Sequence, residues 1–236
     1  MAFTGVCPQG RRINRWQHIA SCGNVTALRY RIYWLSVARG VRLVSAGRGS
    51  AGFGQAVVIS GHMTDSPGRT PPRFPQEAAS AVRQAMDQIL AEREVGRRDL
   101  AITSGARGAD IIGAELCLAR GVTVWLLLPL PEPAFLDRSV RQPGSDWEAR
   151  FRALKGRCTV RYQQDELGPP APGENPFARN NRWCLDLGQA AAGKSGLFAL
   201  VVWDERPASR PGGAADFAAQ AAGRGIPVEI VNPMGS

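Results

Sequence analysis

The stretch DLAITSGARGADIIGAELCLARGVTVWLLLP, residues 99–129, contains one complete unit of an α/β fold. A short apolar strand is expected at 99–103, and a glycine-rich turn follows it. Ile112 and Leu116 then recur at helical spacing, and a long apolar strand is expected at 122–129. Because strands that are joined through a helix pair in parallel, this stretch predicts a parallel sheet.

The same alternation continues on both sides of that stretch. Apolar strands are expected at 56–60, 158–162, 197–203 and 227–231, and helices at 76–93, 145–156, 180–192 and 214–223. Ser145 and Glu148 have the spacing of a capping box at the start of the second of these helices. The pattern predicts a Rossmann-like α/β sandwich of three layers over residues 56–236, with a mostly parallel sheet of about six strands.

Residues 1–55 differ in charge from the rest of the chain. They contain eight arginines and no acidic residue, so that only about +1 of the formal net charge of +9 belongs to residues 56–236. We expect a poorly ordered basic leader that ends in a Gly/Ser-rich linker. A targeting segment, a basic arm for nucleic acid and an extension created by the choice of start site remain open as its origin.

The composition argues against several classes of protein. The sequence has no apolar run of the roughly 18 residues that a membrane-spanning helix needs. Its five cysteines include no C-x-x-C pair, and it has two histidines, so that neither a metal site nor a cofactor is expected. Reduced thiols in a cytoplasmic protein are the simplest interpretation.

The segment GQAAAGKSG, residues 188–196, matches the G-x-x-x-x-G-K-[ST] pattern of a phosphate-binding loop. Such a loop follows a strand and begins a helix, whereas this segment ends an expected helix and leads into a strand. We therefore expect Gly193 to end the helix, with Lys194 near its carboxyl end. The sequence does not predict a P-loop ATPase.

The loops that follow the strands are long and rich in glycine, proline and polar residues, whereas the loops that precede them are short. Because ligands of open parallel sheets bind beyond the carboxyl ends of the strands, the functional site is predicted at that edge. Two junctions there, SGARGAD at 104–110 and RPGGAAD at 210–216, have the strand–glycine–helix order that suits phosphate. Their candidate ligand-binding residues are Gly105, Arg107, Gly108, Asp110, Gly212, Gly213 and Asp216.

In this site the glycines would let the backbone approach a phosphate, Arg107 would pair with it, and the two aspartates would cap helices or hold ribose. The remaining loops add Gly61, His62, Asp65, Arg69, Asn180, Asn181 and Asp204 as ligand-binding candidates. The two asparagines would either cap the start of a helix or contact the other end of the ligand. The candidates for a catalytic role are His62, Asp65, Glu115 and Asp216.

The stretches SGARGADIIGAELCLARG and PGGAAD together resemble the SLOG superfamily, which joins the "lonely guy" phosphoribohydrolases, the DNA-processing protein A family and nucleotide-sensing domains. The resemblance covers residues 56–233 and implies a Rossmann-like fold that binds nucleotides. The second stretch departs from the P-G-G-x-G-T-x-x-E signature of the hydrolases at Ala215, Asp216 and Ala219. Ala219 stands where the hydrolases have the glutamate that stabilises the ribosyl transition state, so that the departure favours binding over hydrolysis. Glu115 or Asp216 could take the place of that glutamate.

These observations predict a domain that binds a nucleotide or a nucleotide-derived small molecule by its phosphate and ribose. It would act as a sensor, as a homo-oligomer or with an effector partner. The first alternative is a nucleoside 5′-monophosphate phosphoribohydrolase, which is an N-glycosidase. The second is single-stranded DNA binding of the DNA-processing type, which the near-neutral charge of residues 56–236 disfavours.

Overall fold

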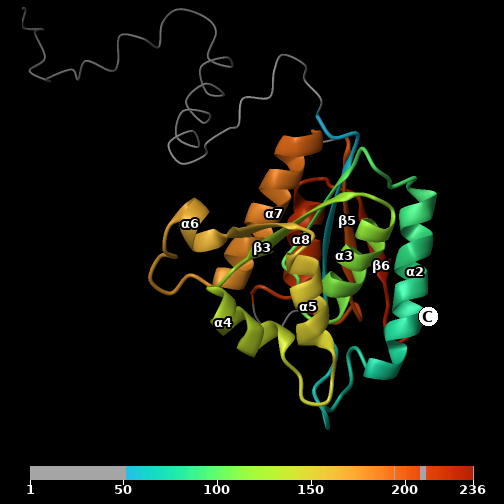
Figure 1. Ribbon diagram of the computed structural model, residues 1–236, viewed down its shortest axis with the longest axis vertical. Coiled ribbons are helices and arrows are strands. Elements are labelled where there is room, and N and C mark those ends of the chain that lie inside the picture. The colour runs from blue at the N-terminus through green and yellow to red at the C-terminus, as the bar shows by residue number, and fades with distance from the viewer. Residues whose placement is uncertain (1–51, 194, 208–210, 236) are drawn as a thin grey trace, which may run out of the picture. The chain divides into compact units, whose positions relative to one another are not determined.

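The computed structural model describes residues 52–193, 195–207 and 211–235 (Figure 1). In these residues, six strands form a single sheet in which all neighbours are parallel. The strands are β1 (Ala56–Gly61), β2 (Leu100–Thr103), β3 (Thr123–Leu128), β4 (Thr159–Tyr162), β5 (Leu197–Val202) and β6 (Val228–Val231). Their order across the sheet is β4-β3-β2-β1-β5-β6. The predicted Rossmann-like α/β fold is confirmed.

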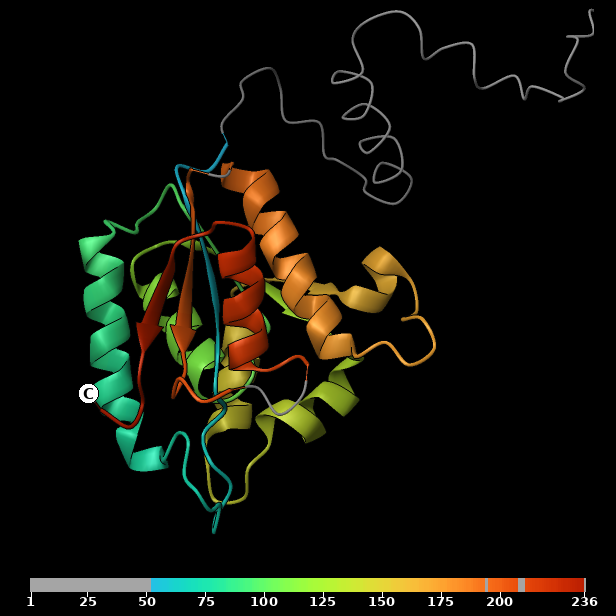
Figure 2. The same cartoon turned by 180° about the vertical axis from the view of Figure 1, so that it is seen from behind.

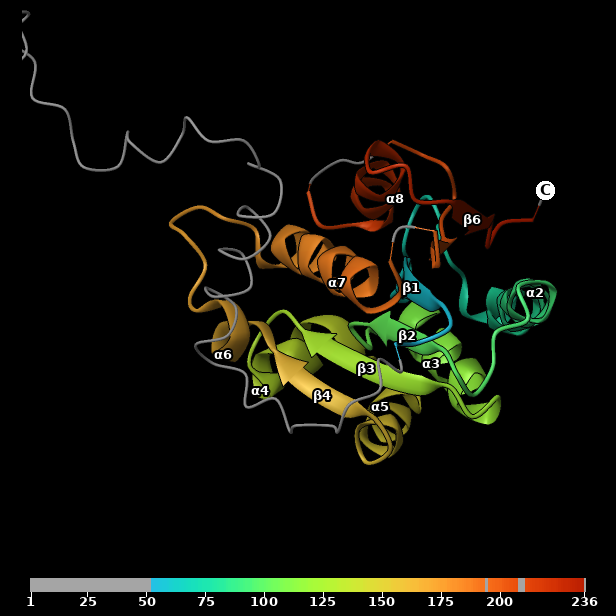
Figure 3. The same cartoon turned by 90° about the horizontal axis from the view of Figure 1, so that it is seen from above.

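Helices cover both faces of this sheet. They are the 3-10 turn η2 (Gln76–Ala78), α2 (Ala79–Glu92), α3 (Ala109–Ala119), α4 (Glu132–Phe135), the π-helical turn η3 (Leu136–Val140), α5 (Trp147–Lys155), α6 (Gln163–Leu167), α7 (Pro176–Ala192) and α8 (Ala214–Gly223). On one face lie α2, α3 and α5, and on the other lie α7 and α8, which run side by side (Figures 2 and 3). Within the described ranges, no helix is both long and apolar enough to cross a bilayer.

The two faces of β1 show how the apolar runs build two cores. Val57 and Ile59 belong to the core under α2, α3 and α5, whereas Ala56 and Val58 belong to the core under α7 and α8. All four side chains are buried, because helices cover both faces of the parallel sheet. The strand is therefore apolar throughout rather than alternately apolar and polar.

The chain reverses its direction across the sheet at β1. From β1 it proceeds outward to β4, and it then returns to β5 on the other side of β1. These two strands pair along their whole lengths, from Ala56 with Leu197 to Gly61 with Val202. After β1 the chain continues as residues 62–75, called the arm below, and after β5 it continues toward α8. Such a reversal opens a crevice at the carboxyl ends of the strands.

The phosphate-loop pattern at residues 188–196 has the context that the sequence predicted. It lies between the last turns of α7 and the start of β5, so that it follows a helix and precedes a strand. Gly193 has a φ of 72°, and its N–H donates to the carbonyl of Gln189 (2.9 Å), which ends α7. Lys194 lies outside the described residues, as does the predicted basic leader apart from residues 52–55.

The start of α5 differs from the prediction. This helix begins at Trp147 without a side-chain capping bond. Ser145 Oγ instead donates to a backbone carbonyl of the preceding turn (2.7 Å), and Glu148 accepts bonds from Arg141 and Arg152. The predicted capping box is therefore wrong, because two guanidinium groups compete better for a carboxylate than one backbone N–H does.

Candidate functional site

A cavity of about 480 Å³ opens at the carboxyl ends of β1 and β2. Its wall comes from the arm, the β2–α3 turn, the helical segment after β3, and the starts of α7 and α8. The predicted ligand-binding residues that line it are Gly61, His62, Asp65, Arg69, Arg107, Asp110, Asn180, Asn181, Gly212 and Gly213. Loops that are far apart in the sequence thus meet at the predicted edge of the sheet.

The amino termini of α3, α7 and α8 all contribute to this wall. At two of them, other groups of the protein accept hydrogen bonds from the backbone N–H groups. At α3, the N–H of Arg107 donates to the carbonyl of Ser139 (2.9 Å), and the N–H of Ala109 donates to the carbonyl of His62 (3.2 Å). At α7, Asn175 Oδ1 accepts from the two N–H groups of the first turn (2.9 and 3.1 Å). These bonds use donors that an anion would need.

The amino terminus of α8 remains open. Its N-cap residue is Gly213, which has no side chain to cap the helix, and Gly213, Ala214 and Ala215 all line the cavity. In the part of the chain that the structure describes, no group accepts a hydrogen bond from the backbone N–H of these three residues. An added Cβ on Gly213 would meet no atom within 4 Å. This end of α8 therefore presents hydrogen-bond donors and a positive helix dipole to the cavity.

Asp216 fixes the turn that leads into α8. Its Oδ2 accepts from the N–H of Gly212 (3.0 Å), from Asn181 Nδ2 (3.1 Å) and from Gln220 Nε2 (2.8 Å). Gly212 has a φ of 91°, and an added Cβ would lie 2.7 Å from Phe177 Cβ, so that only glycine fits. Asp216 does not line the cavity, and its three bonds support a role in holding the turn, whereas the predicted contact with ribose and the predicted catalytic role gain no support.

Four arginines line the cavity, and within the described ranges neither Arg107 nor Arg138 forms an ion pair with a carboxylate. Arg107 is 8% exposed, and its guanidinium donates to the carbonyl of Thr64 (3.2 Å) and to two more distant uncharged oxygens. Burial lowers the pKa of Arg107. Arg138 lies over the ring of Phe177, 5.5 Å from its centroid. Arg107 is buried without a direct ion pair, which is costly, and Arg138 is an exposed guanidinium at the wall, so that both groups favour an anionic ligand.

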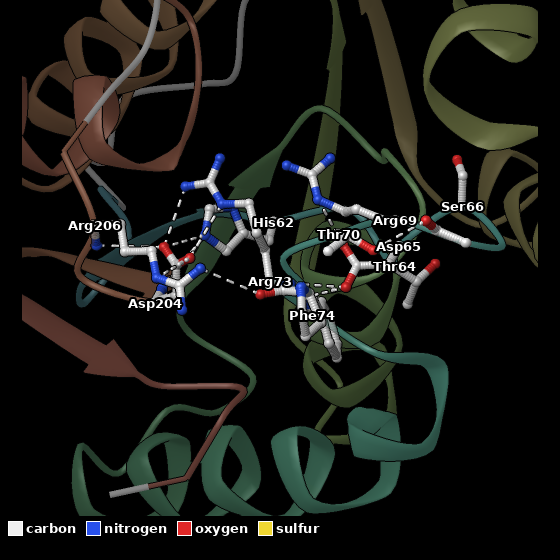
Figure 4. Close-up of polar contacts among 12 residues, drawn as sticks. His62, Thr64, Asp65, Ser66, Arg69, Thr70, Arg73, Phe74, Asp204 and Arg206 are labelled. Atoms are coloured by element: carbon white, nitrogen blue, oxygen red, sulfur yellow. Dashed lines mark hydrogen bonds and ion pairs between the residues drawn. The ribbon is translucent and has the colours of Figure 1, made fainter.

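Two carboxylates hold the arm in place (Figure 4). Asp65 Oδ2 accepts from the N–H groups of Arg73 (2.8 Å) and Phe74 (2.9 Å), and its Oδ1 pairs with Arg69 (3.2 Å). Asp204, on the loop after β5, accepts from Nε and Nη2 of Arg73, both at 3.1 Å. Asp204 does not line the cavity, and its contacts with Arg73 anchor the arm, so that its predicted contact with a ligand is not supported here.

His62 completes the cluster around Asp204, as Figure 4 shows. Its Nε2 lies 2.8 Å from Asp204 Oδ1 and 3.3 Å from the backbone nitrogen of Asp204. One ring nitrogen of a neutral imidazole cannot both donate and accept, and the shorter contact to an ionised carboxylate identifies Nε2 as the donor. Burial lowers the pKa of His62, although the bond to Asp204 acts in the opposite direction. Burial alone would raise the pKa of Asp204, but Arg73 and His62 hold it well below its ordinary value.

Asp110 lies at the start of α3 and lines the cavity. Burial raises its pKa to about 6, although the bonds that Oδ2 accepts from Ser104 Oγ (2.6 Å) and from the N–H of Ala106 (3.2 Å) act in the opposite direction. A buried carboxyl group in a cavity that titrates near neutral pH is typical of functional sites.

The glycines of the β2–α3 turn serve packing within the protein. Gly108 has a φ of 86°, and an added Cβ would lie 2.8 Å from both His62 O and Thr64 N. Gly105 has a φ of 80°, and an added Cβ would lie 3.3 Å from the ring of Phe151. Neither glycine lines the cavity, so that their predicted approach to a phosphate is not supported.

Glu115 lies away from the cavity, on the surface of α3. Its carboxylate accepts from Arg83 (2.9 Å) and from Arg150 (2.8 Å), which come from α2 and α5. The hypothesis that Glu115 replaces a catalytic glutamate has no support from this cavity, because the residue bridges two helices and does not line the cavity wall.

Asn180 and Asn181 lie within α7 rather than at its start. The helix begins at Pro176, and Asn175 is the residue that caps it. The predicted capping role is therefore wrong for the two later asparagines. Asn180 Nδ2 donates to the carbonyl of Leu127 (2.9 Å), which ties α7 to β3, and both asparagines still line the cavity.

The sequence suggested that Arg73 would reach a phosphate or lie on the surface of a proline-rich loop, but it did not predict the pairing of Arg73 with Asp204, and it did not single out Arg138, Phe135 and Phe177. Arg73 is 131 residues from Asp204 in the chain, and no local pattern predicts that pair. Arg138 lies in the segment after β3, which the sequence predicts as a loop but which forms α4 and η3. The apolar residues Leu136 and Val140 are buried there, and their spacing of four residues was the available signal.

Metal ligands do not gather in the described residues: no group of three or more His, Cys, Asp or Glu side chains there is placed to hold a metal ion. Cys117, Cys158 and Cys184 are free thiols. The cavity therefore offers backbone N–H groups, guanidinium groups, carboxyl groups and one imidazole, which suits a polar organic anion.

Comparison with known proteins adds a similarity to a solved structure. No family model matches the sequence, and none of the curated proteins matches it. Among solved structures, the chain is similar to DNA processing protein A (DprA) from Streptococcus pneumoniae, with 16% sequence identity and a TM-score of 0.34. The match covers 75% of this chain and 58% of that one, which is less than two thirds of its length.

Proposed function

We propose that the cavity binds a nucleotide or a nucleotide-derived molecule by its phosphate and ribose. The observation that carries the proposal is the uncapped amino terminus of α8, where Gly213, Ala214 and Ala215 line the cavity. A phosphate there would accept bonds from backbone N–H groups and interact with the positive end of the helix dipole. The cavity volume of about 480 Å³ lies within the range of small-molecule sites, roughly 300–1,000 Å³.

The charges of the wall support an anionic ligand. Arg138 contacts Phe177, which packs against Gly212, so that its guanidinium belongs to the part of the wall next to α8. Arg107 contributes a second, buried guanidinium from the β2–α3 turn. A guanidinium group can donate two parallel hydrogen bonds to two oxygens of one phosphate, and this would orient the ligand as well as hold it.

The remaining wall suits the other parts of a nucleotide. Ser104, Asn181 and Asp65 offer hydrogen-bond partners for ribose hydroxyl groups. Phe177, which is partly exposed, offers apolar surface on which a base would stack.

The role that we propose for the bound state is that of a sensor, which reports its ligand to an effector or to a second copy of the chain. The glutamate of the hydrolase signature is replaced by Ala219, which is exposed on α8. DNA binding of the DNA-processing type has less support, because Asp65 and Asp110 interrupt the basic residues of the wall.

A thermal-shift panel on the full chain tests the binding proposal. The ligands are nucleoside monophosphates, ADP-ribose, NAD, cyclic dinucleotides and ATP with magnesium. A ligand at about 100 times its Kd adds about 2.7 kcal/mol to the free energy of unfolding. This raises the Tm by about 5–10 °C for a domain of this size.

We expect the shift to be reduced in Arg138→Ala and in Arg107→Ala. It should be retained in Arg224→Ala, a control that removes an arginine paired with Asp186 away from the cavity. The absence of a shift with every ligand would refute the proposal, and a shift that neither arginine affects would locate the ligand elsewhere.

A further inference from the structure

Arg107 is the most deeply buried of the four arginines that line the cavity. Its Nε donates to the carbonyl of Thr64 at 3.2 Å, but its two terminal nitrogens have only contacts of 3.4 and 3.5 Å, with Arg141 O and Ser66 Oγ. Ordinary N–H···O bonds span about 2.7–3.2 Å, so that these two contacts are weak. The two nitrogens that form a fork for a phosphate are therefore little used within the described part of the protein.

The charge of Arg107 also lacks a carboxylate in direct contact in the described ranges. Burial lowers the pKa of Arg107, and Asp65 is the charge that acts in the opposite direction. The oxygens of Asp65, however, already pair with Arg69 (3.2 Å) and accept from the backbone N–H groups of Arg73 (2.8 Å) and Phe74 (2.9 Å). Because a buried guanidinium without a partner is costly, Arg107 indicates a second place for an anion, in addition to the start of α8.

These two anion subsites lie apart along the edge of the sheet. The start of α8 follows β5 and the turn with Arg107 follows β2, and β1 lies between these two strands. Since neighbouring strands are about 4.8 Å apart, the two segments leave the sheet about 10 Å apart. The guanidinium of Arg107 contacts Thr64 and Ser66, which Figure 4 shows on the other side of the view from Asp204, a residue of the loop that leads to α8. A single phosphate does not span this separation.

We propose that the ligand is a nucleoside bisphosphate, a nucleotide whose two phosphates are attached to different oxygens of the ribose. The inference rests on the proposed binding function and names the class of nucleotide that the cavity selects. The 5′-phosphate lies at the start of α8, and a phosphate on the 2′- or 3′-oxygen accepts two hydrogen bonds from the terminal nitrogens of Arg107. A 5′-diphosphate does not fit this arrangement, because its two phosphates share an oxygen and both lie next to α8.

The competing explanation for Arg107 is structural. Its backbone N–H donates to the carbonyl of Ser139 (2.9 Å), and its side chain contacts Thr64 and Arg141, so that it joins three segments of the cavity wall. A residue that only held these segments together would, when replaced, weaken the binding of every nucleotide by the same factor. A residue that binds the second phosphate weakens the binding of bisphosphates selectively. The ratio of the two affinities therefore separates the explanations.

The test measures Kd by calorimetry for the full chain with the 5′-monophosphates, 5′-diphosphates and 3′,5′-bisphosphates of adenosine, guanosine, cytidine and uridine. Adenosine 2′,5′-bisphosphate distinguishes the two positions of the second phosphate. Hydrogen bonds to charged groups contribute about 1.5–3 kcal/mol, which corresponds to about a 10–100-fold change in Kd. We expect wild type to bind the bisphosphate of its preferred base more tightly than the monophosphate by this factor, and the diphosphate to gain far less.

Three variants assign the two subsites. Arg107→Gln should lose the gain from the second phosphate and weaken the monophosphate by less than about fivefold, because for that ligand only a distant charge is removed. Arg224→Gln, which removes an arginine paired with Asp186 away from the cavity, should keep the gain. Gly213→Asp, which places a carboxylate at the start of α8, should weaken the monophosphate and the bisphosphate by the same factor, because the subsites are separate.

The outcomes distinguish this inference from the binding function on which it rests. If wild type bound a monophosphate and gained nothing from a second phosphate on the ribose, the bisphosphate would be overturned and the binding function would stand. This comparison of ligands uses wild type alone, so that it does not depend on the stability of a variant. Equal losses for both ligands in Arg107→Gln would overturn the role of Arg107, and failure of every compound to bind would overturn both proposals.

Single-stranded DNA is measured in the same assay, because each internal nucleoside of the strand also lies between two phosphates. The cavity of about 480 Å³ suits one nucleotide, and we expect an oligonucleotide to bind more weakly than the preferred bisphosphate. Tighter binding of the oligonucleotide than of every bisphosphate would make nucleic acid the ligand and overturn the small-molecule class.

Discussion

Gly213 offers a substitution that separates stability from binding. It is the N-cap of α8 with φ −98° and ψ −174°, an extended conformation that any residue adopts, and an added Cβ would meet no atom within 4 Å. Aspartate is a preferred N-cap residue, and its carboxylate would accept bonds from the N–H groups that are open here. We expect Gly213→Asp to stabilise the fold and to block the binding of an anion at the same helix end.

The gain in the free energy of unfolding has three contributions. A carboxylate cap exceeds glycine by roughly a few tenths of a kcal/mol. A negative charge at a helix amino terminus adds about 0.3–1 kcal/mol. Loss of glycine from the unfolded chain adds about 0.4–1 kcal/mol. The total is about 1–2 kcal/mol, which raises the Tm by about 2–8 °C at this size.

The test compares wild type, Gly213→Asp and Gly213→Ala. Calorimetry without ligand measures their stability, and titration with the ligand that gives the largest thermal shift measures their Kd. Alanine brings neither a cap nor a charge, so that it should gain only the contribution of the unfolded chain and keep its affinity. A more stable Gly213→Asp protein that binds with an unchanged Kd would refute the assignment of the phosphate to α8. If Gly213→Asp were no more stable than wild type, the reasoning that the N–H groups at the start of α8 have no partner would be refuted.

Two further predictions concern stability around the β2–α3 turn. Gly108→Ala should cost about 2–5 kcal/mol, because a positive φ costs roughly 1–2 kcal/mol and a Cβ at 2.8 Å from backbone atoms of His62 and Thr64 adds roughly 1–3 kcal/mol. Gly144 has a φ of 74°, but an added Cβ there would meet no atom within 4 Å. Gly144→Ala should therefore cost only the roughly 1–2 kcal/mol of the positive φ. If urea denaturation gave the same loss of stability for both substitutions, the packing argument would be contradicted. The folded state raises the pKa of Asp110 from 3.8 to about 6, so that its contribution to stability is lost as the pH rises through this window. Asp110→Asn should therefore be more stable by about 1–3 kcal/mol at pH 7.5, since one pKa unit corresponds to about 1.36 kcal/mol, and no more stable at pH 4. If Asp110→Asn raised the free energy of unfolding more at pH 4 than at pH 7.5, the charge of Asp110 would not be what destabilises the folded protein.

The strands could be predicted from the sequence because each is an apolar run between polar turns. The runs at 56–60 and 197–203 correspond to β1 and β5 within a residue or two at each end. Their pairing could not be predicted, because it joins Ala56 with Leu197 across most of the chain. The edge that carries the cavity was nevertheless predictable, since all strands of a parallel sheet end on the same side.

The contacts within the site were less predictable than its location. The two glycine turns at 104–110 and 210–216 look alike in sequence, and both precede a helix. The first is closed by the carbonyl groups of Ser139 and His62, which come from other loops, whereas the N–H groups of the second have no acceptor among the residues that the structure describes. A local pattern predicts where a helix begins, but distant residues decide whether its first N–H groups are free.

The hydrogen bond from the N–H of Ala109 to the carbonyl of His62 connects the start of α3 with the imidazole of His62. Gly108 has no Cβ, which lets the arm come so close that the carbonyl of His62 accepts from the N–H of Ala109. The same approach brings the imidazole of His62 against Asp204. A phosphate bound at α3 would have to displace the His62 carbonyl, and displacement of that backbone would move the imidazole away from Asp204. A phosphate bound at α8 leaves both contacts intact, so that the open helix end and the oriented imidazole are compatible only when the anion lies at α8.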